Sequence, residues 1–193
     1  MQRIDHILEK WAEIYKPISH IPGADSKQQA FYRIDSINEQ NGFMRNYNVA
    51  HSPCMAYSTM VDAQLFAKNE KVIDYRHVVY MMIKQRSDNV RRTIVNDDNE
   101  ACEIKFELDD MTQDLVSFLF ELKKACNLGL SVLKLGNKEF KITSEIMLAM
   151  SGFVIDTVEW STIPMKYNGW WIVGIQFSRK ESRKLCLNGE KYT

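Results

Sequence analysis

The chain has 193 residues, and its 45% hydrophobic and 26% charged content is typical of one globular domain, not of a disordered or fibrous protein. Its 25 basic residues balance its 25 acidic ones, so no net charge attracts it to nucleic acid or to an anionic membrane. No stretch reaches the ~18 apolar residues of a membrane span, and the segment Met1–Asp5 lacks the apolar core of a signal peptide. We therefore expect a soluble intracellular protein.

The beginning of the chain predicts an amphipathic helix over residues 2–15. Apolar side chains recur there at helical spacing, while charged residues occupy the opposite face. Pro17 and the Pro22-Gly23 pair then end the helix and open a loop.

The segment from residue 28 to residue 69 leaves alternatives open. Phe31–Asp35 fits either a short strand or the start of a helix. Cys54–Tyr57 fits a strand, which could continue into a turn of helix near Asp62.

Two later segments have the two-residue period of strands. Val72–Gln85 alternates along its length and is rich in β-branched and aromatic residues, which predicts a central antiparallel strand. A polar loop, or a hairpin arm around Thr93-Ile94-Val95, is expected over Arg86–Asn99. In Cys102–Leu108 apolar side chains then alternate with charged ones, which predicts a second, half-buried strand.

The strongest helical pattern covers Asp110–Asn127. Asp109 or Asp110 is expected to cap its N-terminus, and Gly129 to follow its C-terminus. Its apolar stripe consists of Met111, Leu115, Phe118, Leu119, Leu122 and Cys126.

Two hairpins are predicted in the remaining chain. Pairs of glycine and asparagine mark their turns, because these residues readily adopt the left-handed backbone that tight turns require. The first hairpin joins Val132–Leu135 to Phe140–Thr143 across Gly136-Asn137, and the longer second one joins Phe153–Met165 to Trp170–Ser178 across Asn168-Gly169.

This order of elements predicts an α+β fold with a single domain over residues 1–178. The turn signals lie too close together for the crossover connections of a parallel sheet. We expect an antiparallel sheet with long hairpins and the two amphipathic helices packed on one face. Residues 179–193 are predicted to form a charged, mobile tail.

Few residues have the spacing of a catalytic or metal site. The cysteines form no CxxC pair, and His51-x-x-Cys54 is the only close pair of soft metal ligands in the sequence. The sequence contains no nucleophile elbow and no glycine-rich phosphate loop. We therefore predict no catalytic residues, no bound metal and no cofactor. The scattered thiols, expected to be buried and reduced, are Cys54, Cys102, Cys126 and Cys186.

A metal-dependent nuclease is the alternative that the sequence leaves open. Asp97 and Asp98, followed by the Glu103-x-Lys105 pair on the predicted strand, imitate the groups that hold a divalent cation and position the attacking water. The same alternation of charges is also typical of the solvent face of an ordinary strand.

The basic residues form two clusters. One is Arg91-Arg92, and the other comprises Arg179-Lys180 and Arg183-Lys184 of the predicted tail. Glu181 lies among the tail charges, so a solvated terminus accounts for them as well as a nucleic-acid contact does.

Aromatic residues gather on the last hairpin. Part of this group is expected to fill the core and the rest to flank the turn. The neighbours Trp170 and Trp171 must nevertheless face opposite sides of a strand, so one leaves the core unless both faces are covered. Tryptophan on a second face is suited to a protein–protein contact. We therefore hypothesise an interface that consists of Trp160, Tyr167, Trp170 and Trp171.

The order of elements resembles the small α+β proteins of tailed-phage necks and tails, the tail-terminator and head–tail connector group, including virion proteins of the crAss-like phages of Bacteroidetes. The resemblance covers most of the chain. It lies in the N-terminal helix, the strands at Val72–Gln85 and Cys102–Leu108, the helix at Asp110–Asn127 and the final hairpin.

This resemblance implies a non-enzymatic virion protein that assembles into a homo-oligomeric ring. Its long hairpins would reach the neighbouring subunit, and its other partners would be portal, connector or tail-tube proteins. DNA would contact it only in passing through the ring lumen, and no membrane would be involved. The protein is then expected in the virion, and in the host cytoplasm during assembly. A regulatory binding module of a mobile element is a third hypothesis.

Overall fold

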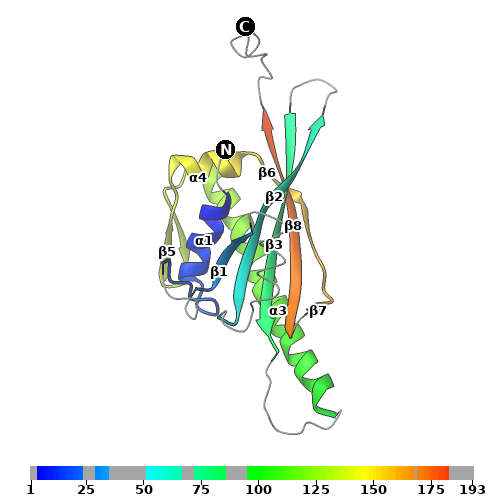
Figure 1. Ribbon diagram of the computed structural model, residues 1–193. Coiled ribbons are helices and arrows are strands. Elements are labelled where there is room, and N and C mark those ends of the chain that lie inside the picture. Colours follow the sequence, from blue (N-terminus) through cyan, green and yellow to red (C-terminus); the bar gives the residue numbers. More distant parts are fainter. Residues whose placement is uncertain are drawn as a thin grey trace.

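The computed structural model describes residues 4–23, 29–34, 51–66, 72–85, 95–167 and 169–182. Within these ranges the chain has the predicted α+β fold, with three helices, a mixed sheet of six strands and a separate small hairpin (Figure 1). In chain order the elements are α1 (Ile4–Ile14), β1 (Phe31–Ile34), β2 (Cys54–Phe66), β3 (Val72–Lys84), α3 (Val95–Asn127), β4 (Val132–Leu135), β5 (Lys138–Lys141), α4 (Ser144–Ser151), β6 (Phe153–Trp160), β7 (Met165–Tyr167) and β8 (Trp170–Ser182).

The six-stranded sheet has the order β1-β2-β3-β8-β6, and the short β7 also pairs with β8. All the described pairs are antiparallel, as predicted, apart from β1 and β2, which run parallel. The separate hairpin is formed by β4 and β5 across Gly136, whose φ of 58° is the left-handed backbone expected of this turn.

The predicted central strand is confirmed. All 13 residues of β3 are paired with β8, from Val72 opposite Ser182 to Lys84 opposite Trp170, and β2 pairs with its other edge. Val79 and Met81 are buried on the face that lies under the helices. The period-two pattern of Val72–Gln85 therefore identified the strand that holds the sheet together.

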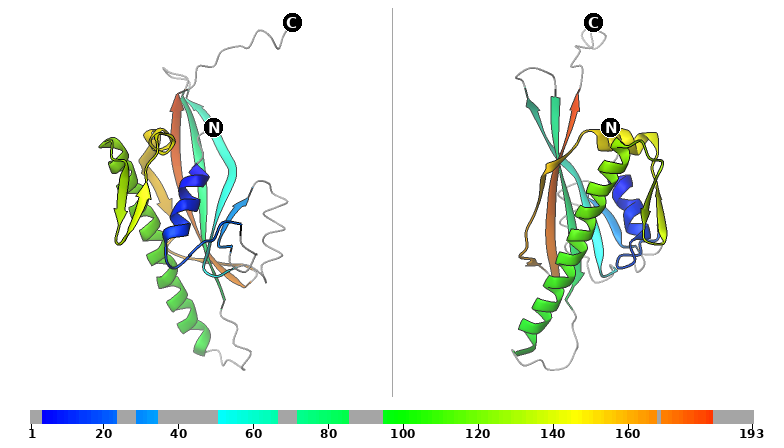
Figure 2. Two further views of the ribbon diagram at one scale, coloured as in Figure 1. Left: turned by 90° about the vertical axis from the view of Figure 1, so that its left-hand side faces the viewer. Right: turned by 180° about the vertical axis from the view of Figure 1, so that it is seen from behind.

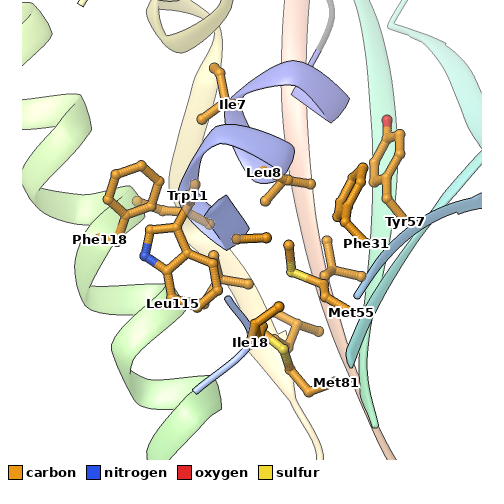
Figure 3. Close-up of a cluster of buried hydrophobic side chains, with 14 of the residues drawn as sticks. Ile7, Leu8, Trp11, Ile18, Phe31, Met55, Tyr57, Met81, Leu115 and Phe118 are labelled. Atoms are coloured by element: carbon orange, nitrogen blue, oxygen red, sulfur yellow. The ribbon is translucent and has the colours of Figure 1, made fainter. Parts of the chain in front are cut away.

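The helices cover one face of the sheet, as predicted, with α1 and α3 forming the main layer (Figure 2). Leu8 and Trp11 of α1 point into a cluster that includes Met55 and Met81 from the sheet (Figure 3). Phe118 brings α3 into the same cluster, with its ring centroid 6.0 Å from that of Trp11. None of the described helices is long and apolar enough to cross a membrane.

The short helix α4 was not predicted. Thr143 caps it by accepting a hydrogen bond from the backbone N–H of Ile146. Gly152 ends it at a close approach to β8, where the backbone N–H of Lys180 donates to Gly152 O at 2.8 Å. A Cβ at position 152 would lie 2.0 Å from the carbonyl oxygen of Lys180, so only glycine fits here.

The predicted strand over Cys102–Leu108 is wrong, because this segment belongs to α3. Ile104 and Leu108, four residues apart, are both buried, whereas Phe106 between them is 64% exposed. That burial follows the helical period and continues the stripe of the following turns, so the alternation in the sequence was coincidental. The expected N-cap at Asp109 or Asp110 is also wrong, since the helix begins at Val95.

Each of the two described segments over residues 29–34 and 51–66 contains a strand. Phe31–Ile34 is a strand and not a helix start. The alternative of a helical turn near Asp62 is wrong, because β2 continues to Phe66. A shift in register between Ser58 and Asp62 interrupts the ladder to β3 at this point. The irregular sequence therefore reflects a bulge and not a change of element.

The predicted start of the tail, at residue 179, is too early in the chain. β8 continues to Ser182, and Arg179 is buried within it beside Glu181, with Nη2 3.3 Å from the carboxylate. The guanidinium also lies over the ring of Tyr75, 5.4 Å from its centroid. Pairing with β3 therefore orders residues 179–182, which the charge pattern of the sequence predicted to be part of a solvated tail. Residues 183–193 lie outside the described part.

Two parts of the fold project beyond its packed layers (Figure 1). At one end, the strands β2, β3 and β8 extend past the helices as a three-stranded arm. At the other, the N-terminal part of α3, whose 33 residues span about 50 Å, extends past the sheet.

The assignment of Cys102–Leu108 to a helix makes a direct prediction. Ile104→Ala should lower the free energy of unfolding by about 3 kcal/mol, because it opens a cavity under the helix. Phe106→Ala should change it by about 0.5 kcal/mol or less, since this side chain is exposed. Urea denaturation measures both. In a strand these residues would share a face, so equal losses would contradict the helix.

Candidate interaction surface

The predicted aromatic group is divided between the two faces of the sheet. Trp170 is only 1% exposed, whereas Trp171 is half-buried on the opposite face, where its register partner is the buried Ile83. The ammonium of Lys166 lies 5.2 Å from the ring centroid of Trp171. Both tryptophans are therefore largely covered within the chain, so the sequence argument for a free tryptophan at this position does not apply.

The exposed apolar surface lies next to these residues, on the connection between β6 and β7. Trp160 is 37% exposed, Ile163 is 74% exposed and Met165 is 64% exposed. We call the segment Trp160–Met165 the apolar tip. Trp160 was predicted as an interface residue, but Ile163 and Met165 were missed because single aliphatic residues beside a proline are ordinary in a sequence. Tyr167, the remaining predicted residue, lies in β7, and its side chain is outside the described part.

The apolar tip has a defined local structure. Ser161 Oγ donates to Ile163 O at 2.9 Å and accepts from Ile163 N at 3.2 Å, which fixes the turn that presents the isoleucine. Glu159 and Lys166, both exposed, flank the tip and give it one charge of each sign. The tip is therefore an ordered apolar surface with a polar rim.

A groove of about 400 Å³ lies at the opposite edge of the molecule, between the end of α1, the middle of α3 and the turn of the β4–β5 hairpin. The buried rings of Trp11 and Phe118 form part of its lining, and the hydroxyl of Tyr15 donates to Asp114 at 2.7 Å across it. We call this the α1–α3 groove. Its lining residues are Trp11, Ile14, Tyr15, Lys16, Pro17, Asp114, Ser117, Phe118, Glu121, Leu135, Gly136 and Lys138.

Sequence reasoning did not find the groove. It depends on contacts between α1 and two much later elements, and Tyr15 and Asp114, which are hydrogen-bonded there, are 99 residues apart in the chain. No local motif marks it, because its aromatic floor has the same helical spacing as any core stripe.

A smaller cleft of about 300 Å³ lies where β6 departs from β8. Asp74, Asp156 and Glu159 line it together with Arg76. These carboxylates are not grouped as metal ligands, and the described residues hold no cluster of His, Cys, Asp or Glu that could bind a metal ion.

A histidine with a strongly lowered pKa is buried in the core. His77 and the hydroxyl of Tyr57 share a hydrogen bond of 2.7 Å, and the ring of Phe177 stacks on the imidazole at 5.3 Å. Burial, aided by the nearby charge of Arg179, lowers the pKa of His77 to about 4, so the ring is neutral at pH 7. Because His77 is almost completely covered, we interpret this pair as a structural hydrogen bond.

The candidate metal pair does not converge on a site. His51 Nδ1 lies 3.1 Å from the carbonyl oxygen of Pro53, and Cys54 is fully buried in β2. Burial raises the pKa of the Cys54 thiol, which keeps it protonated and unreactive.

The candidate nuclease residues lie on α3 and not on a strand. Glu103 and Lys105 are both exposed, but residues two positions apart on a helix point about 200° away from each other. They therefore cannot act on one cation in the way that the strand arrangement required. Asp97 and Asp98 lie in the first turns of the same helix, with their side chains outside the described part. Arg91 and Arg92 also lie outside it.

The buried histidine predicts an acid-sensitive fold. The unfolded chain protonates His77 near pH 6.5, whereas the folded chain keeps it neutral down to about pH 4. The free energy of unfolding should therefore fall by up to about 3 kcal/mol as the pH drops through this window.

The fall in the free energy of unfolding between pH 7 and pH 4 should be clearly smaller in His77→Asn than in the wild type. Urea denaturation at several pH values in this range measures it. Gln113→Asn, at an exposed site without a titratable group, provides the control and should keep the wild-type slope. A residual slope is expected from His20, whose pKa burial also lowers. Equal slopes in His77→Asn and wild type would refute the role of this histidine.

The sequence was also compared with known proteins. No family model matches the chain, and no curated protein matches it. The interpretation of its function therefore rests on the surfaces described above.

Proposed function

We propose that this protein is a ring-forming structural subunit of a phage virion, in the head–tail connector, neck or tail terminator. The observation that supports this proposal best is the apolar tip, where three large apolar side chains are exposed on an ordered turn. Such a surface is costly in water, because burying one side chain of this size contributes about 2 kcal/mol. Apolar patches with a polar rim are typical of protein–protein contacts.

The three-stranded arm also supports an assembly role. The described part of β1 pairs with β2 only as far as Ser58, so the segment of β2 from Asp62 to Phe66 has β3 as its single described neighbour. An unpaired strand edge can accept a strand from another chain. An arm that extends past the packed layers can therefore reach a neighbouring subunit or an adjoining virion protein.

The balanced charge is compatible with such a position. A ring through which DNA passes must not hold the duplex, and a chain with equal numbers of basic and acidic residues has no net attraction to phosphate. The proposed partners are further copies of this chain and the portal, connector or tail-tube proteins on either side.

The proposal predicts that the purified protein forms a discrete oligomer through the apolar tip. Ile163→Glu should weaken self-association at least about tenfold, because it places a charge in the centre of an apolar contact. Light scattering over a range of concentrations measures the change, and negative-stain electron microscopy shows whether the wild-type species is a ring.

Leu148→Glu is the matched control. Leu148 is an exposed apolar residue on α4, outside the tip, so this variant should assemble as the wild type does. A wild-type protein that remains monomeric at high concentration would overturn the proposed function, and equal effects of the two substitutions would show that the tip is not the contact.

A further inference from the structure

The apolar tip and the α1–α3 groove lie at opposite edges of the molecule. In Figure 1 the hairpin that contains β5 lies at the left edge and β7 at the right edge, and the view from behind in Figure 2 shows the same separation. One edge therefore presents an apolar projection and the other an apolar groove.

We propose that the apolar tip of one subunit inserts into the α1–α3 groove of the next copy of the same chain. This inference deepens the proposed function, since it specifies how subunits of the ring would contact one another. A contact between two different surfaces at opposite edges is head-to-tail, and head-to-tail contacts close into rings when the rotation per subunit allows it. A contact of the tip with itself would instead stop at a dimer.

The two surfaces match in shape and in chemistry. Ile163 is the most exposed large apolar residue of the tip and is held outward by its turn. The rings of Trp11 and Phe118 lie beneath the groove, and its accessible lining is mostly apolar, which suits a branched aliphatic side chain. Its volume is within the range of clefts that bind organic groups of comparable size.

Both surfaces carry charges of either sign. Glu159 and Lys166 flank the tip, and the groove is lined by Lys16 and Lys138 as well as by Asp114 and Glu121. Insertion of the tip can therefore place opposite charges beside one another at the rim. Such rim charges contribute orientation and association rate more than affinity.

The groove can be blocked without disturbing the core. Ser117 is exposed on α3 and lines the groove, and Glu121 follows one turn later. In Ser117→Arg the new side chain can pair with Glu121 and occupy the groove. Gln113→Arg is the control, since Gln113 is exposed one turn earlier on the same helix and does not line the groove. Lys138→Glu provides a second groove variant on a different element.

The decisive experiment mixes two variants, each of which lacks one half of the contact. Ile163→Glu retains an intact groove, and Ser117→Arg retains an intact tip. Each alone should self-associate at least about tenfold more weakly than the wild type. A 1:1 mixture should form heterodimers that grow no further, because only one complementary contact remains per pair. Light scattering of the separate and mixed proteins distinguishes these species.

Three outcomes would overturn the inference. A mixture that stays monomeric would show that the two surfaces do not bind one another. If wild type, Ser117→Arg and Lys138→Glu all assemble equally, the groove is not involved, while the proposed function stands. If the wild type itself does not assemble, the proposed function fails and this inference fails with it.

Discussion

The pairing of β3 with β8 is the constraint on which the rest of the structure depends. Thirteen consecutive residue pairs join these strands. On the helix side their apolar residues form the floor for α1 and α3. At one end the same ladder extends into the arm and orders Arg179 beside Tyr75. Near the other end β8 also pairs with β7, so it holds the apolar tip at the edge of the sheet. The central ladder therefore determines where the candidate surface lies.

The sequence predicted the elements with the clearest patterns. In α1 buried and exposed residues follow the helical period. The strand β3 is buried on both sides, with only Arg76 exposed, and its β-branched and aromatic residues identify it. The segment Cys102–Leu108 misled because its four alternating apolar residues fit a strand, whereas in the helix only Ile104 and Leu108 of the four are buried. The longer apolar stripe through Leu108 and the following turns favours the helix over the strand. Tertiary packing determines which of the two structures forms. The bulge in β2 and the helix α4 involve too few residues to give a recognisable periodic pattern in the sequence.

The candidate surface was predictable only in part. The turn at Asn168-Gly169 and the nearby tryptophans pointed to the end of the sheet where the apolar tip lies, and Trp160 is partly exposed there. The argument from Trp170 and Trp171 did not hold, because both faces of the sheet are covered at that point. The exposure of Ile163 depends on the turn that Ser161 closes, and the groove depends on contacts between distant segments. Neither can be inferred from local sequence.

Covalent capture from the tip tests the central claim most directly, namely that the apolar tip contacts the α1–α3 groove of another copy. A photo-activated cross-linking residue at position 163 would mark whatever side chains it contacts in the assembled protein. Mass spectrometry of mixed light and heavy isotope-labelled chains separates adducts between chains from those within one chain. We predict adducts between chains, located in residues 11–17, 114–121 or 135–138. Adducts confined to the same chain, or located on the arm or on the tip of the other copy, would contradict the claim.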